Sequence, residues 1–418
     1  MSFLPLLSEF DCEKFHLPHK IPAPRDLHFR HYYFLEIRII TLDALAVHVT
    51  MNSFLTRAVA LLLFALPTLL GPLGKNVGVA TALPAGFRDE GVARIGEVST
   101  ISFVPKIDGS DGHVMFATIK DGIIKVVPNY DTSGTSATIL DISANVCNNG
   151  ERGMHQVLPH PNFVTNRWIY VTYTYRRNGT CELDSTADTV NRLTRFKALD
   201  DYTLSPESEE VLIETDQLLN KIHNGGDILF GNDGYLYMTI GEDGRKDNAQ
   251  LMNHVFGKVL RLTDDGNIPS DNPFTGAGTG RCNFGAIQTG NTCQEIYATG
   301  FRNPFRFNLN PNTNRNTTEI YIIDVGGKSW EEVSIIKGGG AANAANYGWS
   351  DREGPCQLDS YVNCALPQAS LNYQDPIYYY QHDSEGSGCI TGGVVVPKGI
   401  WPSQYDDAFL FFDFVWGK

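Results

Sequence analysis

Three features are scarce in this chain of 418 residues, and each scarcity excludes a class of protein. Basic residues are outnumbered, with 33 Lys and Arg against 47 Asp and Glu and a formal net charge of −14. That balance argues against a nucleic-acid partner, because affinity for phosphates comes from clustered Lys and Arg. Long amphipathic helical stretches are nearly absent, and no linker rich in Pro, Ser or charge divides residues 83–418. The sequence therefore indicates one large domain with little helix.

The cysteines lack the CxxC spacing of a zinc site and instead favour disulfides. Neighbouring positions suggest that Cys282 pairs with Cys293 and Cys356 with Cys364, each closing a short loop. A bridge between Cys147 and Cys181 has weaker support, which leaves Cys389 over and Cys12 in the N-terminal extension. The sequons at Asn178 and Asn316 fit an exported protein.

The N-terminal part contains two segments outside the expected fold. Residues 51–82 have the layout of a secretory signal peptide, in which Arg57 precedes the apolar run Ala58–Leu70 and small residues follow at Ala80 and Ala82. A membrane anchor is the alternative, but the run is short and prolines interrupt this region. Residues 1–50 form a doubtful N-terminal extension. We therefore expect a secreted, extracellular protein whose domain, residues 83–418, has no membrane span in its mature form.

What is abundant is glycine, with 40 residues, and aromatic side chains in short apolar segments. Several segments flank Asp-Gly, as at Lys120-Asp-Gly and Asn232-Asp-Gly, which is a hairpin signal because glycine accepts positive φ. Many hairpins over some 330 residues predict an all-β propeller of four-stranded antiparallel blades, with functional loops gathered on one face. A large β-sandwich is the alternative.

Candidate functional side chains occur in four loops. His223 precedes Gly225 and Gly226, which would let a ligand approach the backbone, and an imidazole can accept a proton near neutral pH. Arg302 offers a rigid fork of donors for an oxyanion. Gly326 and Gly327 follow a strand, where bare carbonyl groups are hard oxygen ligands for calcium.

The fourth loop, "NGERGMHQVLPHPNF", spans residues 149–163. It presents Glu151 or Arg152 to the expected channel. His155 and His160 invite a zinc interpretation, but no third ligand has suitable spacing to complete a tetrahedral site.

An ordered set of motifs makes the chain recognisable. "GERGMHQVLPHPNF", "HNGGDILFGNDGYLYMTIGEDG", "GKVLRL", "IPSDNPF", "EIYATGFRNPFRF", "DVGGKSWEEV", "NYGW" and "ITGG" occur in this order. Together they resemble the glucose/sorbosone dehydrogenase family, which includes soluble quinoprotein sugar dehydrogenases and Hedgehog-interacting-protein-like proteins. The resemblance covers roughly residues 85–418.

The resemblance implies a six-bladed β-propeller that binds pyrroloquinoline quinone and calcium. By motif, His223 is the expected general base for the anomeric hydroxyl of an aldose sugar, and an external acceptor would reoxidise the cofactor. Arg302 would support charge on the quinone and Asn303 would lie beside it. Glu151 and Asp243 are expected to line the same pocket, and Gly326 and Gly327 would donate carbonyl groups to the calcium ion.

Three departures from the family pattern bear on these expectations. Ile222 stands before the base where the bacterial glucose dehydrogenases have an acidic residue, which removes one partner for orienting the imidazole. Residues 386–393 have no lysine at the position where those enzymes hold one against the cofactor. The sequence stops where family members add another strand, so we expect the last blade to be truncated.

Two other functions remain open from the sequence. A secreted propeller of the Hedgehog-interacting kind would bind a protein or a glycan without turnover. A calcium propeller hydrolase of the lactonase type would need several carboxylates and asparagines around one metal ion, and no such set is evident.

Overall fold

The computed structural model describes most of the expected domain and one segment before it. The described residues are 36–42, 87–128, 135–182, 188–313, 318–338, 344–358, 364, 372–382 and 388–415. The expected signal peptide at residues 51–82 and the sequon at Asn316 lie outside them. Within the described residues, no helix is both long enough and apolar enough to cross a membrane.

The first two blades are four-stranded antiparallel sheets with strands in sequence order. The first consists of β3 (Val98–Pro105), β4 (His113–Ile119), β5 (Ile123–Val127) and β6 (Ala137–Asp141). The second consists of β7 (Met154–Pro159), β8 (Trp168–Asn178), β9 (Asp188–Lys197) and β10 (Glu210–Glu214). The β4–β5 hairpin turns at the Asp-Gly pair seen in the sequence, and Gly122 has φ 100° there.

The next two blades carry most of the candidate site residues. The third consists of β11 (Ile228–Phe230), β12 (Leu236–Ile240), β13 (Lys258–Leu262) and β16 (Ile296–Thr299), with β20 (Ala345–Asn346) added in parallel to β16. The fourth consists of β17 (Pro304–Leu309), β18 (Glu319–Asp324), β19 (Trp330–Lys337) and β23 (Tyr378–Gln381). The β11–β12 hairpin turns at the second Asp-Gly pair, where Gly234 has φ 82°.

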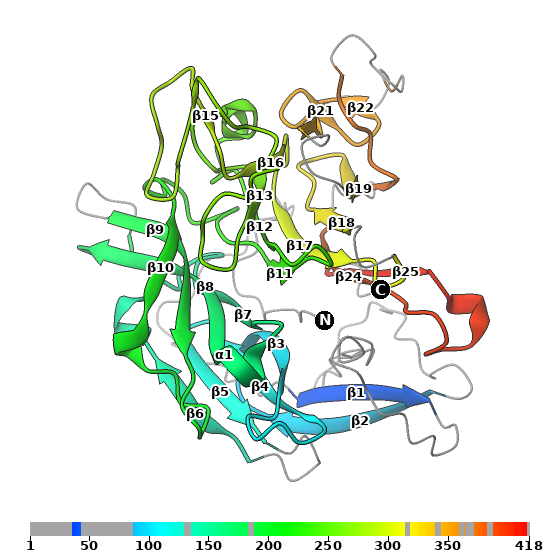
Figure 1. The fold of residues 1–418 in the computed structure, drawn as a ribbon. Helices are drawn as coiled ribbons and strands as arrows, with labels where there is room; N and C mark the ends of the chain where they lie inside the picture. The colour runs from blue at the N-terminus through cyan, green and yellow to red at the C-terminus, as the bar shows by residue number, and fades with distance from the viewer. Residues whose placement is uncertain are drawn as a thin grey trace, which may run out of the picture.

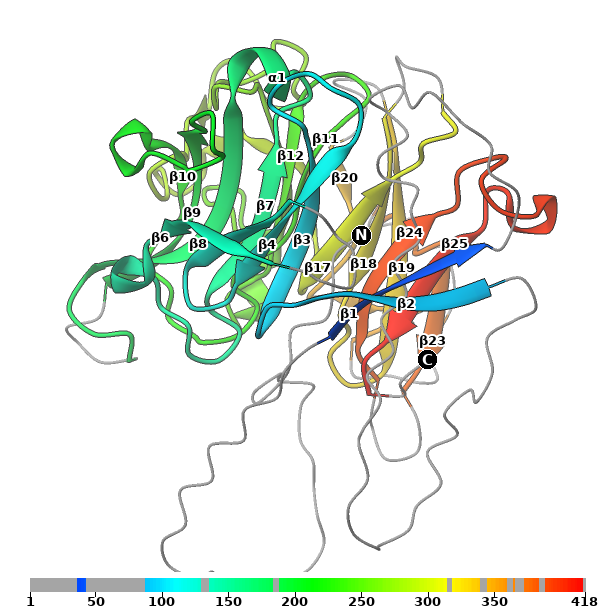
Figure 2. The same ribbon diagram turned by 90° about the horizontal axis from the view of Figure 1, so that it is seen from below.

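The remaining described strands form two-stranded sheets. They are β1 (Glu36–Leu42) with β2 (Phe87–Arg94), β14 (Thr279–Gly280) with β15 (Thr292–Cys293), β21 (Arg352–Glu353) with β22 (Cys356–Gln357), and β24 (Ile390–Val395) with β25 (Phe409–Asp413). Figure 2 shows β24 and β25 beside the β17–β18–β19 sheet, and β24 packs against both β17 and β18.

The sheets are arranged around a common axis as in a propeller, with β3, β7, β11 and β17 innermost (Figure 1). Strands of adjacent blades pack directly, as β3 does on β7 and β12 on β17. The described residues thus contain four blades of four or five strands, so they confirm the all-β propeller but do not establish six blades. Their one α-helix is α1 (Phe163–Asn166).

Burial follows from the sequence of the central strands. β12, "LYMTI", and β13, "KVLRL", are buried at every position, so both of their faces pack between neighbouring blades. Lys258 is tolerated there because its Nζ donates to three carbonyl oxygens, those of Asn248, Ala249 and Phe256, at 2.7–3.0 Å. A buried ammonium has three donors, and here each has an acceptor.

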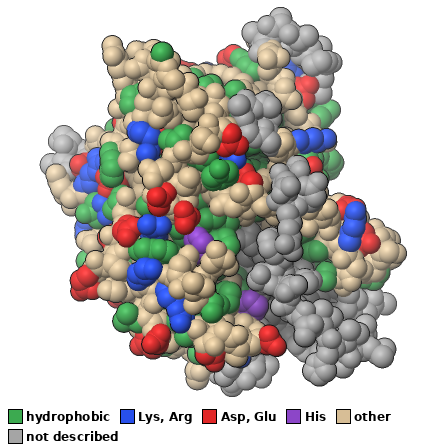
Figure 3. All heavy atoms as spheres, viewed as in Figure 1, with side chains coloured by type: hydrophobic (Ala, Val, Ile, Leu, Met, Phe, Trp, Pro, Cys, Tyr) green, Lys and Arg blue, Asp and Glu red, His purple; other side chains and the backbone are tan. Residues whose placement is uncertain are grey.

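The predicted disulfides are confirmed. Cys147–Cys181, Cys282–Cys293 and Cys356–Cys364 are all bonded, and Cys389 is buried. On the face shown in Figure 3, acidic and basic side chains are interspersed rather than gathered by sign.

Candidate active site

The site is built where three loops of the third and fourth blades meet. The first loop precedes β11 and carries His223. The second follows β12 and contains Gly241, Glu242 and Asp243. The third joins β16 to β17 and carries Arg302 and Asn303.

His223 is buried and has an acidic partner that the sequence analysis missed. Its Nδ1 lies 2.7 Å from Oε1 of Glu242, and both side chains are almost completely enclosed. Burial raises the pKa of Glu242 to about 7, and the positive charge of Arg302 opposes that rise. The sequence had suggested that Ile222 deprives the imidazole of an acidic partner. Glu242, in the turn after β12, is such a partner.

The backbone of His223 is held in the left-handed region, with φ 51°. This conformation costs a non-glycine residue about 1 kcal/mol. It is fixed from both sides, since His223 N–H donates to Oε2 of Glu151 at 2.7 Å and Asp243 N–H donates to His223 O at 3.1 Å.

The turn after β12 connects His223 to Arg302. Glu242 N–H donates to Arg302 O at 2.9 Å, while the side chain of Glu242 contacts the imidazole. Gly241 leaves room for this approach, because a Cβ there would lie 2.5 Å from His223 O and 2.9 Å from Oδ1 of Asn303. His223, Arg302 and Asn303 therefore all lie against the turn of residues 241–243.

Arg302 and Asn303 are fixed by a carboxylate at the end of β18. Oδ2 of Asp324 accepts from Arg302 N–H at 3.0 Å, and Oδ1 accepts from Asn303 N–H at 2.6 Å. Burial raises the pKa of Asp324 to about 7, although these two amide donors favour the charged form. The guanidinium donates to Val325 O at 3.1 Å and lies 5.6 Å from the centre of the Trp349 ring.

The loop of Gly326 and Gly327 encloses a second carboxylate. Four successive amides, from Gly327 to Trp330, donate to one oxygen of Glu353 at 2.8–3.1 Å. Such a concave run of N–H groups is an anion-binding nest. Gly326 N–H donates instead to Glu331 at 3.1 Å, and Glu331 also contacts Nε2 of His382 at 2.7 Å.

Asp243 is buried within its own loop region. Its carboxylate accepts from the amides of Leu219 and Asn220 at 2.9 and 3.1 Å, and Arg245 lies 3.1 Å away. Burial raises the pKa of Asp243 to about 6. These contacts give Asp243 a role in holding the loop before β11.

The glycines after His223 make room for protein groups. A Cβ on Gly225 would lie 2.2 Å from the ring of His155, and one on Gly226 would lie 2.1 Å from Thr239 O. The second blade fills the space beside Gly225 and β12 of the third blade fills the space beside Gly226, so protein groups occupy both positions where we expected a ligand. His155 is therefore an inter-blade contact, and so is His160, whose Nε2 lies 3.3 Å from Oδ2 of Asp264 in the third blade.

Comparison with known proteins identifies the family. A family model described as Glucose / Sorbosone dehydrogenase matches residues 102–398, which is most of the chain. The chain belongs to the glucose/sorbosone dehydrogenase family. The motifs that suggested this resemblance lie almost entirely within the matched range.

Relatives in this sugar dehydrogenase family are 26–29% identical to the chain over the aligned residues. Aldose sugar dehydrogenase YliI of Escherichia coli (strain K12) is 26% identical over 293 residues, covering 69% of this chain and 68% of that protein. HIPL1 protein of Arabidopsis thaliana is 29% identical over 387 residues, covering 77% of this chain and 52% of that protein. The chain thus spans about half the length of the plant relative.

A solved structure shows the same fold. The PQQ-bound form of an aldose sugar dehydrogenase from Streptomyces coelicolor superposes with a TM-score of 0.52 at 20% identity, covering 77% of this chain and 83% of that chain. At this identity the likeness supports the propeller fold.

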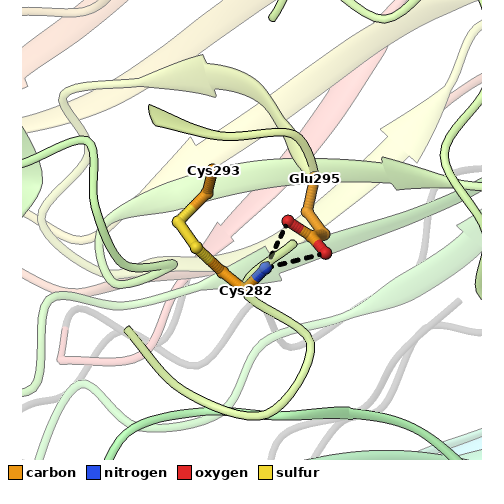
Figure 4. A group of neighbouring side chains, drawn as sticks. All are labelled: Cys282, Cys293 and Glu295. Carbon is orange, nitrogen blue, oxygen red and sulfur yellow. Dashed lines mark hydrogen bonds between the residues drawn. A yellow bond between two sulfur atoms is a disulfide. The ribbon is translucent and has the colours of Figure 1, made fainter. Parts of the chain in front are cut away.

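One further cluster has metal-ligand chemistry but serves the fold. Within the described residues, one group of His, Cys, Asp or Glu side chains has three potential metal-ligand atoms within 4.8 Å of one another. It consists of Cys282, Cys293 and Glu295. Figure 4 shows the two sulfur atoms bonded to each other and both Glu295 oxygens directed at Cys282 N–H. One of these oxygens also accepts from Arg281 at 2.7 Å, so the carboxylate is already engaged.

Sequence reasoning missed Glu242, Asp324 and Glu353. The signal for Glu242 was present in "GEDG", where two acids are adjacent, but the motif does not say which one faces the histidine. The structure decides, because Asp243 has φ 60° and the chain reverses there. Glu353 had no local signal, since it contacts amides 23 to 26 positions earlier.

Proposed function

We propose that the protein oxidises an aldose sugar at the anomeric carbon with pyrroloquinoline quinone as the electron acceptor. The observation that supports this proposal most directly is the turn after β12. Its Glu242 contacts the His223 ring and also donates its N–H to the backbone carbonyl of Arg302. These two contacts support a site in which a proton acceptor and a cation act on the same ligand. Family membership and the PQQ-bound relative support the sugar and the cofactor.

The residues present fit the cofactor. Oδ1 of Asn303 and Nε1 of Trp349 are buried and have no hydrogen-bond partner among the described residues. Both belong to the neighbourhood of Arg302, whose guanidinium lies beside the Trp349 ring and close to the Cβ position of Gly327. Burying a polar atom without a partner costs about 1–3 kcal/mol, so these atoms favour a polar ligand. A bound quinone would supply the two-electron acceptor that the side chains lack.

The same neighbourhood offers oxygen ligands for calcium. Calcium takes backbone carbonyl and carboxylate oxygens. We assign the carbonyl groups of Gly326 and Gly327 to this role, together with Oε2 of Glu353, which is buried and has no hydrogen-bond partner among the described residues. Burial, with Asp324 and Glu353 nearby, raises the pKa of Glu332 well above its usual value, which indicates a local surplus of negative charge.

His223 is the general base in this proposal. Because Nδ1 lies against Glu242, Nε2 is the ring atom that takes the proton of the anomeric hydroxyl. The Glu242 carboxylate then stabilises the imidazolium and keeps the ring oriented. Arg302 stabilises negative charge that develops nearby, in a site where burial strengthens that interaction.

The wider setting completes the proposal. Secretion is supported by three disulfides, which persist in oxidising compartments. A six-bladed ring is supported by the four described blades and by β24–β25 beside the fourth. An external acceptor would remove the electrons after each turnover.

Two measurements test the proposal. The first is a spectral titration of the calcium-loaded protein with the quinone, in which we expect an absorbance shift that saturates at about one equivalent. The second is sugar-dependent dye reduction by wild type and His223→Gln, where we expect a loss of roughly 100-fold or more because general-base catalysis contributes 10²–10⁴. Absence of quinone binding would favour a non-catalytic binding protein, and full turnover by His223→Gln would remove the histidine from its assigned role.

A further inference from the structure

The left-handed backbone of His223 depends on a turn from the second blade. Residues 149–152 precede β7, and Oε2 of Glu151 accepts from His223 N–H at 2.7 Å. His223 has φ 51°, a region that residues other than glycine rarely occupy. A non-glycine residue persists there when its surroundings determine the conformation.

The turn contacts the segment before the histidine at successive positions. Glu151 N–H donates to Lys221 O at 2.8 Å, and Nη2 of Arg152 donates to Asn220 O at 2.8 Å. Gly150 has φ 64°, and a Cβ there would lie 2.5 Å from Lys221 O. The turn is therefore fitted to residues 220–223 through both its backbone and its side chains.

The turn is itself anchored. Asn149 and Arg152 both donate to Cys181 O, at 2.6 and 3.1 Å, and Cys181 is bonded to Cys147. On the other side, Nζ of Lys120 donates to Gly150 O at 2.6 Å. An anchored turn places the Glu151 carboxylate at a defined point instead of leaving it on a free loop.

The geometry points to Glu151 as a positioning residue that fixes the backbone of His223 and so directs its imidazole. This inference rests on the proposed function of His223 and changes the expected role of Glu151, from a cofactor contact to a support for the base. A carboxylate suits the role because a charge-assisted hydrogen bond to a backbone amide is stronger than a neutral one.

The test compares Glu151→Ala and Glu151→Gln with a control at the same loop. Hydrogen exchange of the His223 amide is measured without sugar or quinone, and kcat, KM and the quinone Kd are measured separately. In Glu151→Ala we expect amide exchange to rise and kcat to fall by roughly 10- to 100-fold, the effect of losing one hydrogen bond to a charged group. KM and the quinone Kd should stay within about threefold, since a positioning residue touches neither ligand.

Rescue and the control decide the interpretation. Glu151→Gln keeps an oxygen acceptor and should restore most of the amide protection and of kcat. Glu182→Gln removes a carboxylate paired with Lys221 at 2.6 Å on the exposed side of the loop, and should leave the His223 amide unaffected. If Glu151→Ala does not fold, Glu151→Asp provides the comparison, because its shorter side chain also withdraws the acceptor.

Three results would overturn the inference: unchanged exchange of the His223 amide in Glu151→Ala, a Gln variant as impaired as the Ala variant, or a quinone Kd weakened tenfold with kcat preserved. The last result would make Glu151 a cofactor ligand. If wild type shows neither quinone binding nor turnover, the proposed function fails, whereas the exchange data still decide whether Glu151 holds the backbone.

Discussion

The loop of His223 and the loop of Arg302 are both fixed by carboxylates, but the carboxylates come from different places. Asp324 holds the amides of Arg302 and Asn303 from the end of β18, a strand paired with β17 in the same blade. Glu151 holds the amide of His223 from a turn of the preceding blade. The amides of Arg302 and Asn303 are therefore held by a carboxylate of the fourth blade itself, whereas the amide of His223 is held across the junction of the second and third blades.

This difference leads to an expectation about robustness. Damage inside the fourth blade should affect the fold and the Arg302 loop together. Damage at the junction of the second and third blades should affect His223 while the sheets remain intact. The following experiments separate these two outcomes, beginning with the largest expected effect.

The largest effect is expected for Asp324→Ala. The change leaves two buried amides without their acceptor, and each such loss costs about 1–3 kcal/mol. We expect the free energy of unfolding to fall by about 2–6 kcal/mol in chemical denaturation. Asp324→Asn keeps one acceptor and should lose roughly half as much; equal stability of all three proteins would show that the amides do not depend on this carboxylate.

A smaller, purely functional effect is expected for Glu242→Gln. The amide can still contact Nδ1 of His223, but it does not stabilise an imidazolium by charge. Turnover should fall by roughly 10- to 100-fold, with KM within about threefold and the unfolding midpoint nearly unchanged. The measurement is steady-state dye reduction over a range of pH; a parallel rise of KM would instead indicate that Glu242 contributes to sugar binding.

Acid should weaken the junction beside His223. The ring of His155 lies against Gly225, and burial lowers its pKa to about 3, aided by the positive charges of Arg306 and Lys120. Because the pKa of His155 is lower in the folded protein than in the unfolded chain, the neutral imidazole stabilises the fold. This stabilisation is fully present above pH 6.5 and is lost as the pH falls toward 3. The contribution amounts to about 1.4 kcal/mol per pH unit in that window.

The check is denaturant unfolding between pH 7 and pH 4.5 in wild type and in His155→Gln, which cannot titrate. We expect the variant to be less stable at pH 7 but to lose less stability on acidification. The same pH slope in both proteins would mean that His155 is charged in the folded state or that it is not buried.

The smallest effect is expected for the surface pair Lys221–Glu182, whose atoms are 2.6 Å apart with the Glu182 side chain 66% exposed. Exposed pairs contribute about 0–1 kcal/mol because solvent and salt screen them. Glu182→Gln should therefore leave the unfolding midpoint in chemical denaturation nearly unchanged. A larger shift would show that this pair, and not Glu151 alone, supports the loop of His223.

Local features of the fold followed from the sequence. The Asp-Gly pairs at residues 121–122 and 233–234 form hairpin turns because glycine accepts the positive φ that these turns require. The paired cysteines close as their spacing suggested. The scarcity of helical patterns was also informative, because even the short apolar segment Glu210–Glu214 is a strand, β10, paired with β9 in the second blade.

The sequence by itself also determined which chemical groups are present, namely an imidazole at 223, a guanidinium at 302 and a glycine pair at 326–327. Only the tertiary structure decided which carboxylates serve them. Glu242, and not Asp243, contacts the imidazole because the backbone reverses at Asp243. The other three carboxylates bind amides that lie 21 to 72 positions away in the sequence; they are Glu151, Asp324 and Glu353. Turn propensity and hairpin pairing are local properties of the chain, whereas a hydrogen bond between distant segments depends on how whole blades pack.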